Sequence, residues 1–175
     1  MDDSAGRIHF EHPFATPLQE RDPARRFRGR LASPVTVWTA GTVTGRGALT
    51  ISSLLVAEGE SALLLGLISD VSELWAAIQD SAAFVVHVLH ANHRRLADRF
   101  ALRIPAPGGL FADLEVSESP WGPILGEVKT RAYCRLESTS SVGYAQLATG
   151  RIERLDLDED LDDPLVYFRG HYLTR

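Results

Sequence analysis

The chain has 175 residues, 45% of them hydrophobic, and carries 23 acidic against 18 basic side chains. This length and composition suffice for one domain with a sizeable core and are too small for two. The net charge of −5, without a basic block, excludes electrostatic attraction to nucleic acid or to an anionic membrane, and we expect neither as a partner.

The sequence shows no targeting or membrane-spanning segment. The opening MDDSAGRIHFEHPF has no apolar run of signal-peptide type, and no window approaches the roughly 20 apolar residues of a membrane helix. The single cysteine, Cys134, leaves no intramolecular disulfide, which suits a reducing compartment. Nothing nearby in the sequence would activate its thiol, so we predict a buried cysteine in a cytoplasmic protein.

The chain is expected to begin with an arm and to continue as one domain. Residues 1–22 are of mixed polarity and contain several prolines, which predicts an N-terminal arm. The domain is predicted to span residues 23–175, starting where Asp22 can cap and Pro23 can open a short helix.

Strands are expected to precede the first long helix. Residues 34–57 alternate β-branched and aromatic residues around the turn TVTGRG and predict consecutive short strands. The apolar run ESALLLGLIS is bounded by turn residues and predicts a strand buried on both faces. The period then changes, because SDVSELWAAIQDS opens with capping residues and spaces Val71, Leu74 and Ile78 as on one helix face. A helix is predicted over residues 71–80.

The rest of the chain predicts one strand, one helix, a loop and three strands. AAFVVHVLH has strand character, and ANHRRLADRFAL predicts a short helix with Leu96, Ala97 and Phe100 on one side. Residues 103–123 are rich in Pro and Gly and predict a long functional or interface loop. The closing strands are expected at residues 128–138, 142–156 and 164–169.

This order of elements favours a barrel. It lacks the regular strand–helix alternation of a doubly wound sheet. Closure of a sheet hides the edges that so many short strands would expose. We therefore predict a mainly β fold with helices, a closed or half-closed antiparallel barrel of α+β type.

Six segments in this order resemble a known family. They are SPVTVWTAG, GALTISSLL, ISDVSELWAAI, FVVHVL, LADRFA and DPLVYFRGHY, spread over residues 24–173. Together they resemble the flavin reductase-like family with the FMN-binding split-barrel fold. The resemblance implies a split β-barrel homodimer of Greek-key type with weakly held flavin at the dimer interface. It also implies hydride transfer from NADH or NADPH to FMN or FAD, and a flavin-dependent monooxygenase as partner.

The resemblance assigns Thr50, Ser52 and Ser53 to the flavin, as hydroxyls that bind the ring edge or the ribityl and phosphate arm. Alternation along a strand places Thr50 and Ser52 on one face and Ser53 on the other. The alternative is that these hydroxyls bind neighbouring backbone groups, as most side-chain hydroxyls do.

The same resemblance assigns Ser69 and Ser72 to the flavin phosphate, at a helix start whose unpaired N–H groups attract anions. Asp70 and Glu73, however, have the spacing of a capping box and would repel a phosphate. The family usually has a basic residue in place of Glu73. Arg46, beside the TGRG turn, could offset the repulsion. We therefore expect weak flavin affinity, and loss of the phosphate site stays open.

The C-terminal segment VYFRGHYLTR is implied to close over the flavin and the nicotinamide. Tyr167 and Arg169 are assigned to cofactor binding, and His171 is the candidate on the nicotinamide side. The alternative is a strand with aromatic side chains in the core and Arg169 on the surface. Trp38 is the tryptophan expected beside a ring, and the resemblance places Phe100 near the cofactor, although both suit plain packing. Hydride transfer between stacked rings makes no catalytic acid or base obligatory.

The sequence leaves a metal site and a rival function to consider. His87, His90 and His93 are close in sequence, but a strand turning into a helix does not set three imidazoles around one metal, so no metal site is predicted. The rival function is a non-catalytic protein on the same fold that holds flavin, deazaflavin or another planar ligand, since fold alone does not determine function.

Overall fold

The computed structural model describes residues 22–159 and 163–173. The helices are α1 (Pro23–Arg28), α2 (Glu73–Ser81) and α3 (Arg94–Phe100), with a short 3-10 turn, η1 (Ala91–His93), before α3. The strands are β1 (Ser33–Pro34), β2 (Thr36–Ala40), β3 (Gly47–Ile51), β4 (Leu54–Ala57), β5 (Leu63–Ile68), β6 (Ala83–Val88), β7 (Val116–Ser117), β8 (Ile124–Leu125), β9 (Arg131–Val142), β10 (Ala145–Asp156), β11 (Val166–Phe168) and β12 (His171–Tyr172). None of these helices is long and apolar enough to cross a membrane.

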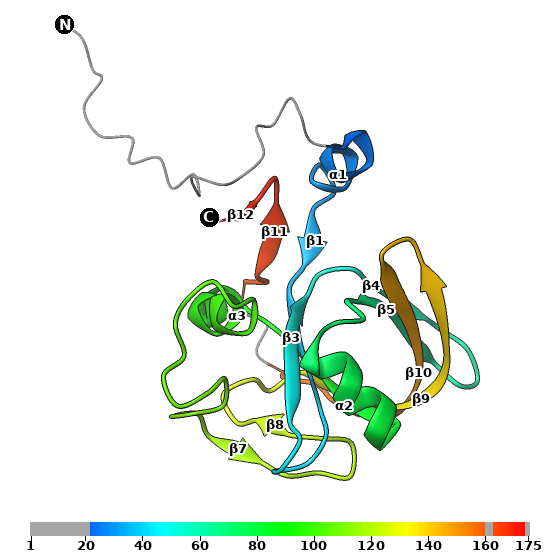
Figure 1. Ribbon diagram of the computed structural model, residues 1–175, viewed down its shortest axis with the longest axis vertical. Helices are drawn as coiled ribbons and strands as arrows, with labels where there is room; N and C mark the ends of the chain where they lie inside the picture. Colours follow the sequence, from blue (N-terminus) through cyan, green and yellow to red (C-terminus); the bar gives the residue numbers. More distant parts are fainter. Residues whose placement is uncertain (1–21, 160–162, 174–175) are drawn as a thin grey trace, which may run out of the picture.

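The main sheet is antiparallel and curls on itself. Its strand order is β3-β2-β6-β9-β10-β5-β4, so β3 and β4 are its two edges. Only Ser52 and Ser53 separate these edges along the chain, and we call this pair the seam. The edges must therefore lie close together, and the Leu67 backbone N–H donates to the Ser53 carbonyl at 3.0 Å. Figure 1 shows the curled sheet, which confirms the predicted mainly β, half-closed barrel.

Two large rings fill the barrel and depend on glycines opposite them. Trp38 in β2 and Phe84 in β6 are fully buried and stack with ring centroids 4.8 Å apart. A Cβ at Gly66 would lie 2.4 Å from the Trp38 ring, and one at Gly150 would lie 2.4 Å from the Phe84 ring. Both glycines thus provide the space that the stacked pair occupies.

Helix α2 lies across the curled sheet and covers the same core (Figure 1). Leu74 and Ile78 are buried, as expected from the helical spacing. Val71 is 90% exposed and precedes the helix, so its predicted place on the buried face is wrong. The helix begins later because Ser72 is its N-cap, and it ends at Ala82, which adopts a left-handed φ of 50°.

Helix α3 packs on a second core cluster beneath the long connection to β9. Leu96, Ala97 and Phe100 are buried there, as predicted. The connection was predicted as irregular over residues 103–123, and it contains the short paired strands β7 and β8.

Strand β5 differs from its prediction in one respect. Leu64, Gly66 and Ile68 point into the core and are buried, whereas Leu63 and Leu65 are only partly buried and Leu67 is 38% exposed. The prediction that this strand is buried on both faces is therefore wrong within a single copy of the chain. The N-terminal arm predicted over residues 1–22 lies outside the described residues, apart from Asp22, which caps α1.

Candidate functional site

A pocket of about 560 Å³ opens between α1, the seam and the C-terminal hairpin. Ser52 and Ser53 line it from the seam, and Tyr167, Arg169 and His171 line it from β11, β12 and their turn. Pairing of β1 with β11, with Ser33 opposite Tyr167, brings these two segments, far apart in the sequence, to this place. Five of the residues predicted for cofactor or nicotinamide binding are thus gathered in one pocket.

The seam hydroxyls differ from Thr50. The Thr50 hydroxyl donates to the Ala97 carbonyl of α3 at 2.7 Å, so it binds a backbone group, and Thr50 does not line the pocket. Ser52 and Ser53 are half-buried, and within the described residues neither hydroxyl has a hydrogen-bond partner. Of the three predicted hydroxyls, two are therefore available to a ligand.

A two-residue turn presents Arg169 to the pocket. Phe168 pairs with His171, and between them Arg169 and Gly170 have φ values of 50° and 92°. Positive φ at both positions is the pattern of a type I′ hairpin turn, which favours Asn-Gly. The Arg169 N–H donates to the Gly29 carbonyl at 2.8 Å, which ties this turn to the end of α1.

Tyr167 is held by a cluster at the start of the long connection. Arg103 donates to its hydroxyl at 2.6 Å, and the guanidinium lies 5.1 Å from the Tyr167 ring centroid and 5.7 Å from that of Tyr172. Asp98 pairs with Arg103 at 3.6 Å. Burial, reinforced by the Asp98 charge, raises the pKa of Tyr172 to about 12. The β11–β12 hairpin is thereby fastened to α3.

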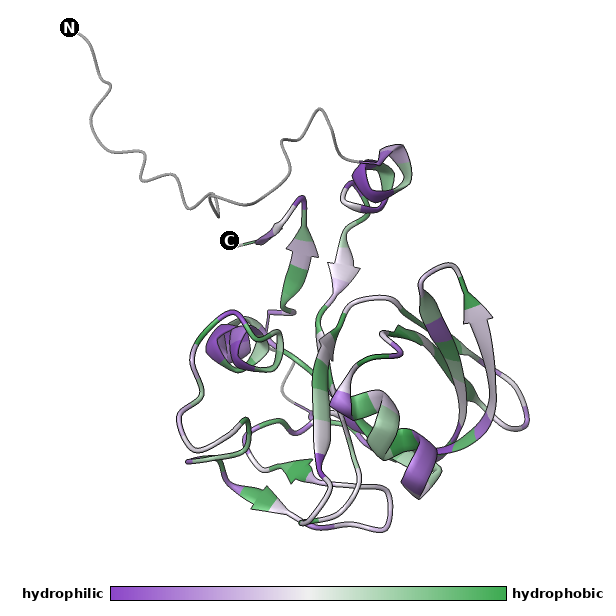
Figure 2. Ribbon diagram, viewed as in Figure 1, coloured by the Kyte–Doolittle hydropathy of each residue, from purple (hydrophilic) through white to green (hydrophobic). Residues whose placement is uncertain are grey.

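Four arginines that sequence reasoning missed line the same pocket. Three belong to α1 and the fourth follows it: Arg25, Arg26, Arg28 and Arg30. Helix α1 has no buried residue, and Figure 2 shows it as largely hydrophilic. The signal was present in DPARRFRGR, where four arginines occur within six residues, but it was interpreted only as a helix start.

The predicted phosphate-binding residues of α2 lie elsewhere. The Ser72 hydroxyl accepts from the Trp75 N–H at 3.1 Å and donates to the Ser69 carbonyl at 2.7 Å. Ser69 is exposed, and neither serine lines the pocket. The Ser72 hydroxyl thus serves the helix end, and Asp70 and Glu73 stand exposed beside it.

Arg46 lies in a different hollow, of about 710 Å³, with Glu73 and Phe111. It pairs with Glu118, and its guanidinium is 5.6 Å from the Phe111 ring centroid. It therefore fastens the long connection to the β2–β3 turn and does not join the seam pocket.

Trp38 and Phe100 are both 0% exposed. Trp38 stacks on Phe84 and donates its indole N–H to the Thr36 hydroxyl at 3.0 Å, while Phe100 contacts Phe111 edge to face. Both rings are enclosed in the two core clusters, so the structure places neither of them at the pocket surface. Plain packing, the alternative weighed for each, accounts for them.

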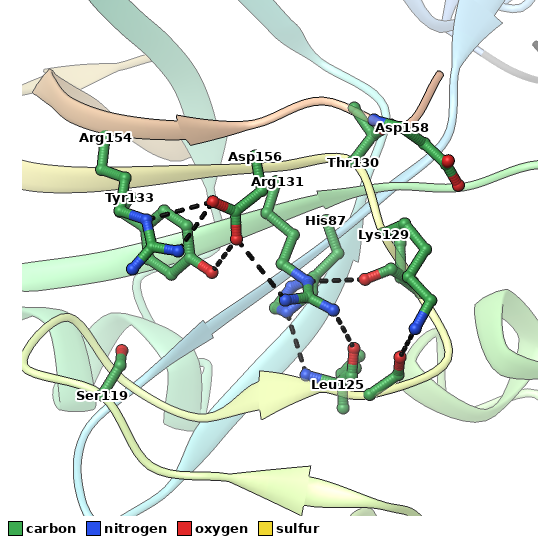
Figure 3. Close-up of polar contacts among 12 residues, drawn as sticks. His87, Ser119, Leu125, Lys129, Thr130, Arg131, Tyr133, Arg154, Asp156 and Asp158 are labelled. Carbon is green, nitrogen blue, oxygen red and sulfur yellow. Dashed lines mark hydrogen bonds and ion pairs between the residues drawn. The ribbon is translucent and has the colours of Figure 1, made fainter. Parts of the chain in front are cut away.

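A second polar cluster, drawn in Figure 3, serves the fold. Tyr133 and Arg154 both donate to Asp156, at 2.6 and 2.8 Å, and Arg131 lies 3.6 Å from the same carboxylate. The Tyr133 hydrogen bond is the main cause that holds the pKa of Asp156 below its ordinary value. These groups satisfy one another.

The neighbouring histidine and cysteine are structural. His87 is buried between the Val37 carbonyl and the Leu125 N–H, each at 3.1 Å from a ring nitrogen. Within the described part of the chain no group of three or more metal-ligating side chains forms. Cys134 is buried, as predicted, and burial raises the pKa of its thiol to about 12.

Comparison with known proteins agrees with this architecture. The family model described as "Flavin reductase like domain" matches residues 28–174. The chain is 34% identical over 158 residues to the flavin-dependent monooxygenase reductase subunit HsaB of Rhodococcus jostii (strain RHA1), covering 86% of this chain and 77% of that protein. It is 29% identical to the NADH-dependent FMN reductase AsuE2 of Streptomyces nodosus subsp. asukaensis, covering 88% and 84% of the two chains.

A solved structure with the same fold is nitrilotriacetate monooxygenase component B from Mycobacterium thermoresistibile. It superposes with a TM-score of 0.76 at 26% identity, covering 86% of this chain and 83% of that one. The family model spans far more than half of the residues, and the overall fold is shared with this solved structure. The chain therefore belongs to the flavin reductase-like domain family.

Proposed function

We propose that this protein is an NADH-dependent flavin reductase that transfers hydride from the nicotinamide to FMN or FAD. The observation that carries the proposal is the seam pocket, where two unpartnered serine hydroxyls meet Tyr167, His171 and a set of arginines. Relatives named as NADH-dependent FMN reductases support the choice of substrates.

The side chains present fit a flavin nucleotide. Hydroxyls at the seam can bind the polar edge of the ring system, and guanidinium groups can bind its phosphate. The pocket volume of about 560 Å³ lies within the range of small-molecule sites, about 300–1,000 Å³. When bound, the flavin supplies the hydride-accepting ring.

The chain's own residues supply binding and orientation. Ser52 and Ser53 donate from a backbone fixed by both sheet edges, so the acceptor they hold has a defined position. Tyr167 lines the pocket, and its hydroxyl accepts from Arg103, which holds the ring in position. His171 stands exposed at the rim, the position we assign to the nicotinamide side.

We further propose a homodimer. The outward face of β5 and its neighbours is apolar: Leu55 is 72% exposed, and it lies opposite the half-buried Leu65. Leu67, on the same face, lies opposite Leu147 of β10. A strand that is apolar on both faces is expected to have both covered, and a second copy of the chain would cover this one.

The proposed partner is a flavin-dependent monooxygenase that receives the reduced flavin. Relatives named as reductase subunits of such systems support this. The seam pocket opens to solvent beside exposed α1, so bound flavin can leave, which suits weak binding of flavin as a substrate. The cytoplasm stays the proposed location.

The test is NADH oxidation by the purified protein with FMN, FAD or riboflavin, followed by absorbance against flavin without protein. We expect oxidation that requires both protein and flavin. A Ser52→Ala/Ser53→Ala double variant is expected to raise the flavin KM several-fold, whereas Ser140→Ala, at an exposed position of β9, leaves it unchanged. Flavin binding without NADH oxidation above background would favour the non-catalytic binding protein instead.

A further inference from the structure

We propose that Arg25, Arg26, Arg28, Arg30 and Arg169 form the phosphate-binding site for the nucleotide substrates of this protein, and that the start of α2 does not. The proposal rests on the proposed function for the identity of the ligand. It names the residues that would make phosphorylated flavin and nicotinamide preferred over uncharged analogues.

The first observation is the charge of the pocket. Five arginines line it, and none of the described residues that line it is acidic. Within residues 22–159 and 163–173, none of the five makes an ion pair. This collection stands against a net charge of −5 for the whole chain. Arginines gathered around one pocket without carboxylates repel one another, and an oxyanion relieves that repulsion while accepting their hydrogen bonds.

The second observation is the position of Arg169. Its left-handed φ of 50° is uncommon for a residue with a long side chain, and a turn of this type prefers asparagine there. Its N–H bond to Gly29 brings the turn against the end of α1. Favourable interaction of basic residues with a helix C-terminus explains arginines in α1 but not Arg30 or Arg169, which lie outside the helix.

The third observation is the occupied start of α2. The Ser72 hydroxyl is committed to Trp75 and Ser69, and Asp70 and Glu73 add two negative charges. The family resemblance places the flavin phosphate there, and this chain offers it repulsion. The seam pocket offers hydroxyls and uncompensated positive charge together, so one concave site can take both the ring edge and the phosphate.

Two nucleotides carry the phosphate chemistry that suits this site, the flavin and the nicotinamide. The experiment measures binding of pyrophosphate, FMN, riboflavin and ADP-ribose by titration calorimetry at low salt. It uses the full chain and three variants: Arg25→Gln/Arg28→Gln, Arg169→Asn, and Arg151→Gln. Arg151 is the matched control, because it lies on β10 in surface pairs with Glu137 and Glu153 and does not line the pocket.

For the unaltered chain we expect pyrophosphate binding that weakens with salt, and FMN binding at least tenfold tighter than riboflavin. Both variants of pocket arginines should lose most of that preference, and Arg151→Gln should keep it. Arg169→Asn guards against misfolding, because asparagine suits the turn and its melting temperature should not fall. A larger loss for FMN than for ADP-ribose assigns the site to the flavin, and the reverse assigns it to the nicotinamide.

Unchanged pyrophosphate binding in both pocket variants would overturn the proposal. So would equal affinity for FMN and riboflavin together with ADP-ribose binding that both pocket variants leave unchanged. Its failure can be told apart from that of the proposed function. If the variants lose anion binding, the phosphate site is supported even when the protein reduces no flavin. Conversely, NADH-dependent flavin reduction without any effect of the arginines leaves the reductase and removes this site.

Discussion

At the scale of single residues, His87 is the clearest source of pH dependence. Burial lowers its pKa from 6.5 to about 3, against a smaller opposing effect of its hydrogen bond to Val37. The folded chain thus keeps the ring neutral, with Nδ1 donating to Val37 and Nε2 accepting from Leu125. The proton on Nδ1 is the form that satisfies both partners.

Stability is predicted to fall as the pH drops below 6.5. Between pH 6.5 and 3 the unfolded chain binds a proton at His87 that the folded chain does not, so the free energy of unfolding decreases. At pH 5 this loss is about 2 kcal/mol, from about 1.4 kcal/mol per pH unit. Urea unfolding at pH 7 and pH 5 measures it. A His87→Gln variant should show a shallower pH dependence, and an equal slope in both proteins would contradict the assignment.

Gly66 is predicted to resist enlargement. A Cβ there would lie 2.4 Å from the Trp38 ring, which is itself stacked on Phe84 and unable to retreat. Gly66→Ala should therefore lower the free energy of unfolding by about 1–3 kcal/mol, as for other overpacked cores. Gly45→Ala is the control, because nothing lies within 4 Å of its Cβ position. Chemical unfolding of the two variants gives the comparison, and equal stabilities would show that the core yields.

Residue pattern and resemblance named part of the candidate site. Ser52 and Ser53, with Tyr167, Arg169 and His171, were named from sequence and share one pocket. The partner of Thr50 could not be named, because Ala97 is 47 residues away and reaches it only through the packing of α3 on β3. The place of Trp38 inside the core could not be predicted either, because an aromatic residue in a strand gives no sign of which side of the sheet it faces.

At the scale of elements, the start of α2 tests whether Ser72 caps the helix or binds a ligand. Ser72→Ala removes the N-cap acceptor for the Trp75 N–H, so the free energy of unfolding should fall by about 1 kcal/mol. Flavin affinity should stay the same, because Ser72 does not line the seam pocket. Urea unfolding and flavin titration on the same variant test both statements. A several-fold loss of flavin affinity would contradict this and would indicate that the flavin phosphate binds at the start of α2.

The apolar outer face of β5 and its neighbours predicts that the protein is a dimer. Leu55→Lys introduces a charge on the apolar outer face beside Leu65, so the proposed dimer should dissociate. Light scattering after size-exclusion chromatography measures the mass. Leu157→Lys is the control, at a position 71% exposed and outside the β4–β5 pair. A monomeric unaltered chain, or a Leu55→Lys variant that stays dimeric, would contradict this face as the interface.

The arginines of α1 show why elements can hide a site. Four arginines in DPARRFRGR suit a short solvated helix, and nothing in their spacing indicates a fifth arginine near the other end of the chain. Pairing of β1 with β11 and the Arg169–Gly29 hydrogen bond bring them together. That convergence is a property of the sheet pairing and not of either segment.

At the scale of the whole molecule, the order of strands and helices was enough to predict the barrel, whereas the joining of its edges was not. Many short strands with few crossing helices favour closure. Which strands become edges depends on pairings such as β2 with β6 and β6 with β9, between segments up to about fifty residues apart. Local patterns carry no such information, so the seam appeared in the sequence only as a strand with extra hydroxyls.

Ser52 and Ser53 are the covalent link between two sheet edges. A molecule bound by their hydroxyls therefore stabilises the closed arrangement of the sheet. It binds the folded chain alone, so at a hundred times its dissociation constant it adds about 2.7 kcal/mol to the free energy of unfolding. The side chains at these two positions can be replaced, but the number of residues between β3 and β4 cannot change, since one inserted residue would separate the two sheet edges. The length of this two-residue link thus couples substrate binding by the seam hydroxyls to the closure of the barrel.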